Sequence, residues 1–166
     1  MLARAEHKLP AGDYAYEVKW DGFRAIVSTE DGFRVRSRRG WNMAPLIPEL
    51  ARDDVHGIFD GELVAFQDGL PHFPLVTARM LHKKRNVPVA YAVFDVLALD
   101  GEPTTSLPYS ERRELLESLG VDGFWFLPPV FEDGPAMFAS VCEQGLEGVV
   151  AKRRDSVYGA WCARAG

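Results

Sequence analysis

Apolar and polar residues alternate along two short stretches near the start of the chain, residues 14–18 and 23–28. This period-two pattern is typical of strands that bury one face. Asp21 and Gly22 stand between the two stretches, and an Asp-Gly pair in such a setting is a strong signal for a tight turn. The pattern therefore predicts a β-hairpin over residues 14–28.

Similar short stretches recur along the rest of the chain. They predict strands at residues 32–38, 57–59, 62–67, 89–97, 124–127 and 148–152, with turns at 31–32 and 67–69. Because hairpins dominate and helices are inserted between them, the predicted class is α+β, with mainly antiparallel sheets and flanking helices.

Helical spacing of apolar residues is found in three places, which predicts helices at residues 45–52, 110–119 and 135–144. Ser110 is expected to be the N-cap of the second helix and Gly120 its stop. Met137, Phe138 and Val141 form a stripe on the third helix, which we expect to pack in the core.

Length and composition fit one globular domain. The chain has 166 residues, 47% of them hydrophobic and 26% charged, which is enough to bury a core. No apolar run is long enough to cross a bilayer, and no basic-then-apolar leader opens the sequence. Cys142 and Cys162 lack metal-ligand spacing and are expected to be free thiols. We therefore expect a cytoplasmic protein without a membrane partner.

Basic residues are clustered although the net charge is −5. Arg34, Arg36 and Arg38 stand two apart, and residues two apart on a strand share one face. A face of arginines without interleaved acids indicates contact with a polyanion. The basic run at 82–85 is interpreted as a solvated surface.

Lys19 stands at the end of the first predicted strand, beside Trp20 and close to Arg24. A charged residue next to a turn is most often only solvated. A lysine amine can instead attack an electrophile, but only in its uncharged form, which nearby cations and apolar walls favour. The lysine alone leaves both interpretations open.

Three further stretches place charge at the edge of an apolar strand. Residues 59–66 contain Asp60 and Glu62, residues 91–101 contain Phe94 next to an aspartate, and residues 147–154 contain Glu147 and Lys152. No Gly-x-Gly-x-x-Gly follows a predicted strand and no P-loop is present, which excludes a Rossmann or P-loop nucleotide site.

Taken together and in this order, the motifs resemble those of the covalent nucleotidyltransferases, the superfamily of ATP-dependent DNA ligases, RNA ligases and capping enzymes. Residues 19–24, Lys-Trp-Asp-Gly-Phe-Arg, are similar to the Lys-x-Asp-Gly-x-Arg motif of that superfamily. The segments at 37–40, 60–62, 91–95 and 147–152 resemble its later motifs, and the resemblance runs from residue 1 to about 158. Within the superfamily the chain looks most like bacterial ATP-dependent DNA ligases. The resemblance implies an adenylation domain with an ATP-grasp-like fold.

The resemblance also implies a role for each matched residue. Lys19 would attack the α-phosphate of ATP and hold AMP, with Arg24 and Lys152 as further catalytic cations. The implied nucleotide-binding set is Glu17, Lys19, Arg24, Arg38, Glu62, Phe94 and Lys152. Within it, Glu17 would recognise adenine and Phe94 would stack on it. Glu62 and Glu147 would hold Mg²⁺, a cation that prefers carboxylate, phosphate and water oxygens.

The last eight residues depart from the family pattern. We expect residues 1–158 to form the adenylation domain and 159–166 a truncated or degenerate tail without an OB-fold domain. Ala163 and Ala165 stand after Trp161 where the family has lysines. A fragment of a longer ligase and a natural short form both remain open, as do a ligase-derived interaction module and an RNA ligase or capping-type enzyme. The expected partner is nicked duplex DNA, bound weakly by this chain alone, with an OB-fold domain or repair partner supplied in cis or in trans.

Overall fold

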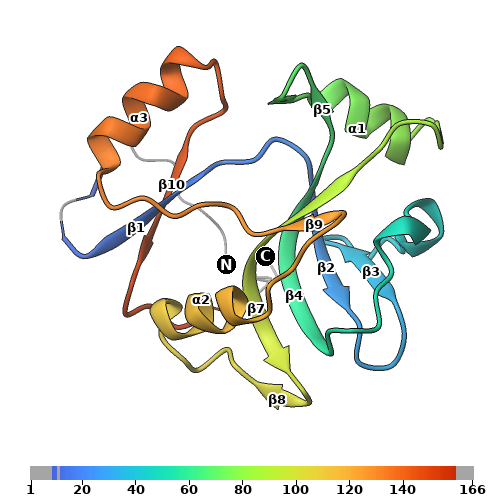
Figure 1. Ribbon diagram of the computed structural model, residues 1–166, viewed down its shortest axis with the longest axis horizontal. Coiled ribbons are helices and arrows are strands. Elements are labelled where there is room, and N and C mark those ends of the chain that lie inside the picture. The colour runs from blue at the N-terminus through green and yellow to red at the C-terminus, as the bar shows by residue number, and fades with distance from the viewer. Residues whose placement is uncertain (1–8, 11, 160–166) are drawn as a thin grey trace, which may run out of the picture.

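Two antiparallel sheets, one large and one small, make the framework of the computed structural model, which describes residues 9–10 and 12–159 (Figure 1). The large sheet runs in the order β3-β2-β4-β7-β8, with β9 parallel to β7. Its strands are β2 (Phe23–Ser28), β3 (Arg34–Ser37), β4 (Gly57–Val64), β7 (Ala90–Leu99), β8 (Glu102–Pro103) and β9 (Trp125–Phe126). The small sheet pairs β1 (Tyr14–Val18) with β10 (Val149–Arg153).

The remaining elements lie at the edges and faces of these sheets (Figure 1). A short ribbon pairs β5 (Phe66–Gln67) with β6 (Leu70–Pro71). The helices are α1 (Phe73–Met80), α2 (Tyr109–Ser118) and α3 (Gly134–Glu143). Helix α2 packs on β7, and α3 packs on β1 and β10. The α+β class with mainly antiparallel sheets is confirmed. Among the residues described, no helix combines the length and apolar content needed to cross a membrane.

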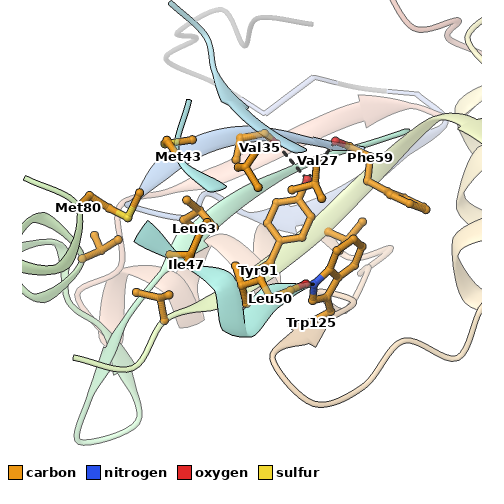
Figure 2. Packing of buried hydrophobic residues seen from close by; sticks show 14 of the residues in the cluster. Val27, Val35, Met43, Ile47, Leu50, Phe59, Leu63, Met80, Tyr91 and Trp125 are labelled. Atoms are coloured by element: carbon orange, nitrogen blue, oxygen red, sulfur yellow. Dashed lines mark hydrogen bonds between the residues drawn. The ribbon is translucent and has the colours of Figure 1, made fainter. Parts of the chain in front are cut away.

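The main core lies against the large sheet (Figure 2). Tyr91 and Trp125 are fully or almost fully buried there, and each polar atom has a partner: the Tyr91 hydroxyl donates to the Ala25 and Phe59 carbonyls, and the Trp125 indole donates to the Leu50 carbonyl. A buried aromatic residue keeps its packing gain when its polar atom is hydrogen-bonded. The six-stranded sheet is therefore a firm base for side chains on its other face.

A second, smaller core lies between the small sheet and α3. It consists of Tyr16, Met137 and Val141, with partly buried apolar residues around them. This confirms core packing for Met137 and Val141. The expectation for Phe138 is wrong, because 48% of that residue is exposed. Cys142 is a free, exposed thiol, while Cys162 lies outside the described residues.

The predicted hairpin over residues 14–28 is wrong, although both of its strands exist. β1 pairs with β10, with Tyr14 opposite Arg153 and Val18 opposite Val149, whereas β2 pairs with β3 and β4. Residues 19–22 therefore cross from one sheet to the other. A Cβ atom on Gly22 would lie 2.1 Å from the Leu63 carbonyl oxygen, so the glycine allows a close approach to β4 and does not close a hairpin.

Two further element predictions are wrong around residues 45–67. The predicted helix at 45–52 is two single 3-10 turns, at Ala44–Leu46 and Pro48–Leu50. Pro48 lacks the N–H group that a continuous helix would need at that position. The predicted strands at 57–59 and 62–67 are divided differently: residues 57–64 form one strand, β4, which carries register shifts against β7, and residues 66–67 form β5.

The structure has one helix that the sequence does not predict and two that begin a residue earlier than predicted. Helix α1 was not predicted, and it begins at Phe73 with a proline in its first turn. Helix α2 begins at Tyr109, so Ser110 lies inside it and is not the N-cap. Gly120 has φ +57°, a conformation that suits glycine, and the helix ends before it as predicted.

Candidate active site

Lys19 lies where the chain leaves the small sheet and turns towards the large one. Its backbone N–H donates to the Gly148 carbonyl at 2.9 Å, which continues the β1–β10 pairing by one residue. Its amine forms an ion pair with the Glu147 carboxylate. The two side chains are 43% and 39% exposed, and exposed ion pairs contribute little to stability. This pair can therefore open at little cost when a ligand arrives.

Lys152 comes from β10 and points inward between the two sheets. The residue is buried, and its amine lies 2.8 Å from Glu17 Oε1 and 3.0 Å from the Phe94 carbonyl oxygen, to which it donates. The Tyr109 hydroxyl also donates to Glu17 Oε1. Burial and the Glu17 charge raise the pKa of Tyr109, so it remains a donor. Together Lys152 and Tyr109 hold the Glu17 carboxylate in one orientation.

Phe94 presents its ring to cations from both sheets. The Lys152 amine lies 4.8 Å from the ring centroid, and the centre of the Arg24 guanidinium lies 5.6 Å from it. Both distances are within the range of a cation–π contact. An aromatic ring with two cations close to its face suits a ligand that combines a flat ring with negative charge.

Arg24 is held by an ion pair with Asp60, whose side chain is fully buried in β4. The Arg24 Nε atom donates to Asp60 Oδ1 at 3.0 Å, and Nη2 donates to Oδ2. Burial lowers the pKa of Arg24, but the hydrogen bond and charge of Asp60 outweigh burial and leave the pKa raised. Paired in this way, a planar guanidinium keeps a fixed direction.

Glu62 lies opposite Arg24 in the β2–β4 pairing. Burial raises its pKa to about 8, although the charges of Arg24 and Lys19 pull in the other direction. A carboxyl group with this pKa is mostly protonated at neutral pH. It becomes an anion when a further cation comes close.

The structure thus brings together most of the residues predicted from sequence. Contacts or charge effects connect Glu17, Lys19, Arg24, Glu62, Phe94, Glu147 and Lys152 across the two sheets. Arg38 is exposed and follows Ser37, which pairs with Ala25 on β2. It therefore lies one residue beyond the end of β3, the edge strand of the sheet. Continuing the β2–β3 register by one residue would set it opposite Arg24.

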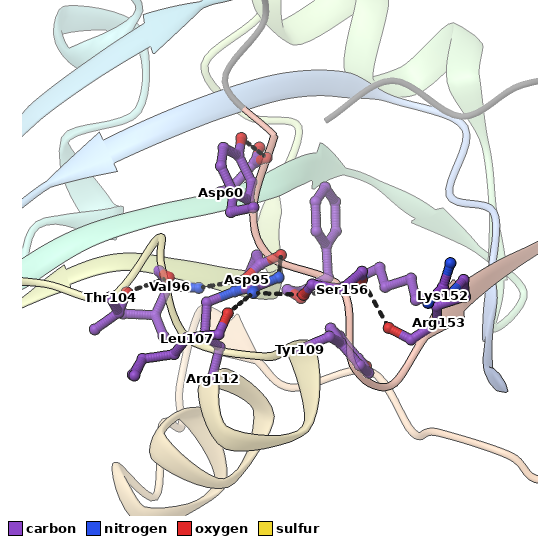
Figure 3. A network of polar contacts seen from close by, with 12 residues as sticks. Asp60, Asp95, Val96, Thr104, Leu107, Tyr109, Arg112, Lys152, Arg153 and Ser156 are labelled. Carbon is purple, nitrogen blue, oxygen red and sulfur yellow. Dashed lines mark hydrogen bonds and ion pairs between the residues drawn. The ribbon is translucent and has the colours of Figure 1, made fainter. Parts of the chain in front are cut away.

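Sequence reasoning gave no role to three residues that complete this cluster. Asp60 holds Arg24, Tyr109 holds Glu17, and the Tyr158 hydroxyl donates to Asp60 Oδ2 at 2.7 Å. Figure 3 shows where Asp60, Tyr109 and Lys152 lie. Asp60 could have been found, because an acid within a buried strand needs a partner. The two tyrosines are distant in sequence from the residues that they contact and show no local pattern.

The carboxylates around Lys19 fit a magnesium ion that arrives with a nucleotide. In the described part of the chain, no three His, Cys, Asp or Glu side chains form a group that could hold a metal. Glu147 contacts Lys19, and the charge of Lys19 acts on Glu62. Mg²⁺ is often bound by one or two carboxylates plus phosphate and water oxygens. Two acidic side chains that interact with Lys19 suit that pattern, whereas an all-protein metal cage would need more.

A lysine with cations, carboxylates and an aromatic face on two antiparallel sheets defines a nucleotidyltransferase domain. The solved structure described as mycobacterial DNA ligase D complexed with ATP and MES is similar to the chain, with a TM-score of 0.76 and 36% identity. The similarity covers 88% of this chain and 50% of that one. The chain belongs to the ATP-dependent DNA ligase family: residues 2–162 match the family described as ATP dependent DNA ligase domain, and the fold is that of its adenylation domain.

Two curated relatives show how the chain compares with whole proteins. It is 39% identical over 165 residues to the multifunctional non-homologous end joining DNA repair protein LigD of Mycobacterium tuberculosis, covering 93% of this chain and 21% of LigD. It is 34% identical over 152 residues to the SPbeta prophage-derived DNA ligase-like protein LigB of Bacillus subtilis, covering 88% of this chain and 56% of LigB. The chain thus spans about a fifth of LigD and just over half of LigB.

Proposed function

We propose that this domain transfers AMP from ATP to Lys19 and supplies the resulting lysyl-AMP for the sealing of nicks in DNA. The observation that carries the proposal is that Lys152 on β10 and Arg24 on β2 both lie over the ring of Phe94. Lys19, just after β1, pairs with Glu147, and its charge acts on Glu62. Cations and an aromatic face suit a base and its phosphates. The family match supports the same chemistry.

The reaction at Lys19 begins with the opening of its ion pair to Glu147. The half-exposed ammonium gives up a proton to solvent, and the amine lone pair then attacks the α-phosphorus of ATP. A P–N bond forms, the bond from that phosphorus to the bridging oxygen breaks, and pyrophosphate leaves with the electron pair. Lys152 and Arg24 offset the negative charge that gathers at the reacting phosphate.

The other residues position the nucleotide. Glu17, held by Lys152 and Tyr109, is placed to recognise one edge of adenine, with Phe94 stacking on the base. Arg24 and Glu62 hold the ribose region, and Arg38 faces phosphates from the edge of the large sheet. Glu62 and Glu147 are the residues that would hold Mg²⁺, which offsets phosphate charge when it is bound.

The acceptor of the AMP group is proposed to be the 5′-phosphate at a nick in duplex DNA. The relatives named for non-homologous end joining support a role in DNA repair, in the cytoplasm of a bacterial cell. Exposed Arg34 and Arg36 on β3 offer contacts to the DNA backbone. We propose that this chain binds DNA only weakly and that an OB-fold domain or a repair partner, in cis or in trans, strengthens the binding.

Self-adenylylation tests the proposal directly. The protein is incubated with α-labelled ATP and Mg²⁺, and label is sought on the denatured chain. We expect the wild type to be labelled and Lys19→Ala to be unlabelled while remaining folded. Lys19→Arg should also be unlabelled, because a guanidinium stays protonated and cannot act as a nucleophile.

Lys84→Ala serves as the control, because Lys84 is an exposed lysine in the loop after α1. It should be labelled as well as the wild type. A wild type without label would reject the proposal and favour a binding module derived from a ligase. Label on Lys19→Ala would mean that another residue accepts AMP.

A further inference from the structure

Three hydrogen bonds join residues 156–158, in the segment after β10, to distant parts of the chain. Arg112 Nη1 donates to the Ser156 carbonyl at 3.1 Å, and the Tyr158 N–H donates to the Thr105 carbonyl at 3.0 Å. The Tyr158 hydroxyl donates to Asp60 Oδ2 at 2.7 Å. The first two contacts fix the backbone of residues 156–158, and the third joins the Tyr158 side chain to Asp60 in the site.

Tyr158 reaches the nucleotide site through Asp60, and it also forms a side-chain hydrogen bond with Arg24. The fully buried Asp60 carboxylate accepts two hydrogen bonds from Arg24, one at each oxygen, and Tyr158 shares Oδ2 with the second of them. A buried carboxylate must have its acceptor positions filled, and the number of its partners decides how freely it can turn. With Tyr158 in place, the carboxylate is held from both β2 and the segment after β10.

Tyr158 is suited to this task at any pH at which the domain would work. Burial raises its pKa, and the negative charge of Asp60 raises it further, so the hydroxyl keeps its proton and remains a donor. The ring lies 5.8 Å from the centre of the Arg112 guanidinium. This contact restrains the ring and therefore the direction of its hydroxyl.

We propose that Tyr158 is a positioning residue, which holds the Asp60 carboxylate so that Arg24 is directed at the nucleotide. The inference rests on the proposed function. The segment after β10 would then contribute to adenylylation as well as to the packing of the domain. Loss of the hydroxyl should leave the fold intact but allow the Arg24 guanidinium to move away from the position over Phe94.

The alternative is that Tyr158 only anchors the end of β10. An anchor would change stability, and its removal would combine additively with changes at Arg24. A positioning residue acts through Arg24, so its removal should have no effect once Arg24 is gone. Tyr158→Phe, Arg24→Ala and the double variant separate these possibilities.

The first measurement is the initial rate of labelling with α-labelled ATP over a range of ATP concentrations. Tyr158→Phe should lower the rate by about 10- to 100-fold at low ATP, the range that corresponds to one hydrogen bond to a charged group. In the Arg24→Ala background the same change should have less than about a twofold effect. Tyr16→Phe is the matched control, since its hydroxyl donates at 3.2 Å to the Pro10 carbonyl, away from Asp60, and it should label like the wild type.

The second measurement does not depend on activity. Hydrogen exchange at the Arg24 Nε–H group, followed by ¹⁵N NMR, should be about tenfold faster or more in Tyr158→Phe and unchanged in Tyr16→Phe. Unchanged exchange, or equal rate losses with and without Arg24, would overturn the inference. If the wild type takes no label while exchange still responds to Tyr158→Phe, the proposed function fails and the positioning of Arg24 stands.

Discussion

Glu62 shows how one residue can make the stability of this domain depend on pH. Burial raises its pKa to about 8 in the folded chain, from an ordinary value of 4.5. The folded chain therefore binds this proton more tightly than the unfolded chain does. Between these two pKa values, stability from this group is present at low pH and is lost as the pH rises towards 8.

Glu62→Gln removes this titration and should change the pH profile of unfolding. As the pH rises from about 5 to about 9, the free energy of unfolding of the variant should increase relative to that of the wild type. The gain is limited to about 1.4 kcal/mol per pH unit, the maximum for one proton. Urea unfolding at several pH values in that range measures it.

Glu114→Gln provides the comparison, because Glu114 is an exposed glutamate on α2. Its unfolding free energy should run parallel to that of the wild type across the same range. A Glu62→Gln profile that also stays parallel would contradict a raised pKa at Glu62.

The sequence predicted this site well at the residues that carry charge in short motifs. Lys19, Glu62 and Glu147 were expected around one nucleotide, and the structure connects all three by contact or charge. Tyr109 and Tyr158 could not be predicted, because each acts on a residue about 90 positions or more away in the chain. Only the folded structure brings such pairs together.

At the scale of elements, the attachment of α2 to β7 depends on a buried ion pair. Arg112 and Asp95 are fully or almost fully buried and share two hydrogen bonds, at 2.6 and 3.0 Å. Arg112 Nη1 also donates to the Leu107 carbonyl at 2.6 Å. A buried charge that loses its partner has neither solvent nor counter-ion, which is strongly unfavourable.

Asp95→Ala should lower the free energy of unfolding by about 3–5 kcal/mol, because it leaves the Arg112 guanidinium buried without its carboxylate. Thermal or urea unfolding measures the loss. Glu117→Ala, which removes an exposed partner of Arg113 on the same helix, should cost less than about 1 kcal/mol. Equal losses in the two variants would show that burial does not set the strength of the Arg112–Asp95 pair.

Strands were easier to predict than their partners. The bounds of β1 and β2 follow from alternation within a few residues, and both were predicted correctly. Their pairing was not, because a turn signal such as Asp21-Gly22 reports only on its own neighbourhood. The partner of β1 is β10, at the other end of the described chain, and no local rule could select it.

At the scale of the whole molecule, charge limits how firmly the chain can hold DNA. The net charge is −5, and one basic surface that could face DNA is the exposed face of β3 with the turn that follows it. Phosphate contacts dominate the affinity of proteins for nucleic acid and weaken as salt rises. A domain with few such contacts should bind duplex DNA weakly by itself.

We expect binding to nicked duplex that falls steeply with salt, and no measurable sealing of a pre-adenylylated nick by this chain alone. Replacing Arg34 and Arg36 with glutamine should reduce the slope of log affinity against log salt by about 2. Fluorescence anisotropy over a roughly fourfold range of salt, from about 50 to about 200 mM, provides the measurement.

Replacing Lys83 and Lys84 with glutamine is the control, because both are exposed in the loop after α1. The slope should change less than with the β3 pair. Efficient sealing at physiological salt would contradict the expectation and show that the chain needs no further DNA-binding surface.

The pairing of β1 with β10 has a consequence for how the domain is made in the cell. Lys19 and Glu147 are 128 positions apart in sequence, and Lys152 follows Glu147 on the strand that completes the small sheet. A ribosome that has translated most of the domain has therefore released Lys19 before it has made Glu147 and Lys152. Because contacts between distant segments form only after a long loop has closed, Lys19 gains its partner in the last stage of synthesis. A nascent or prematurely terminated chain carries the lysine but no nucleotide site.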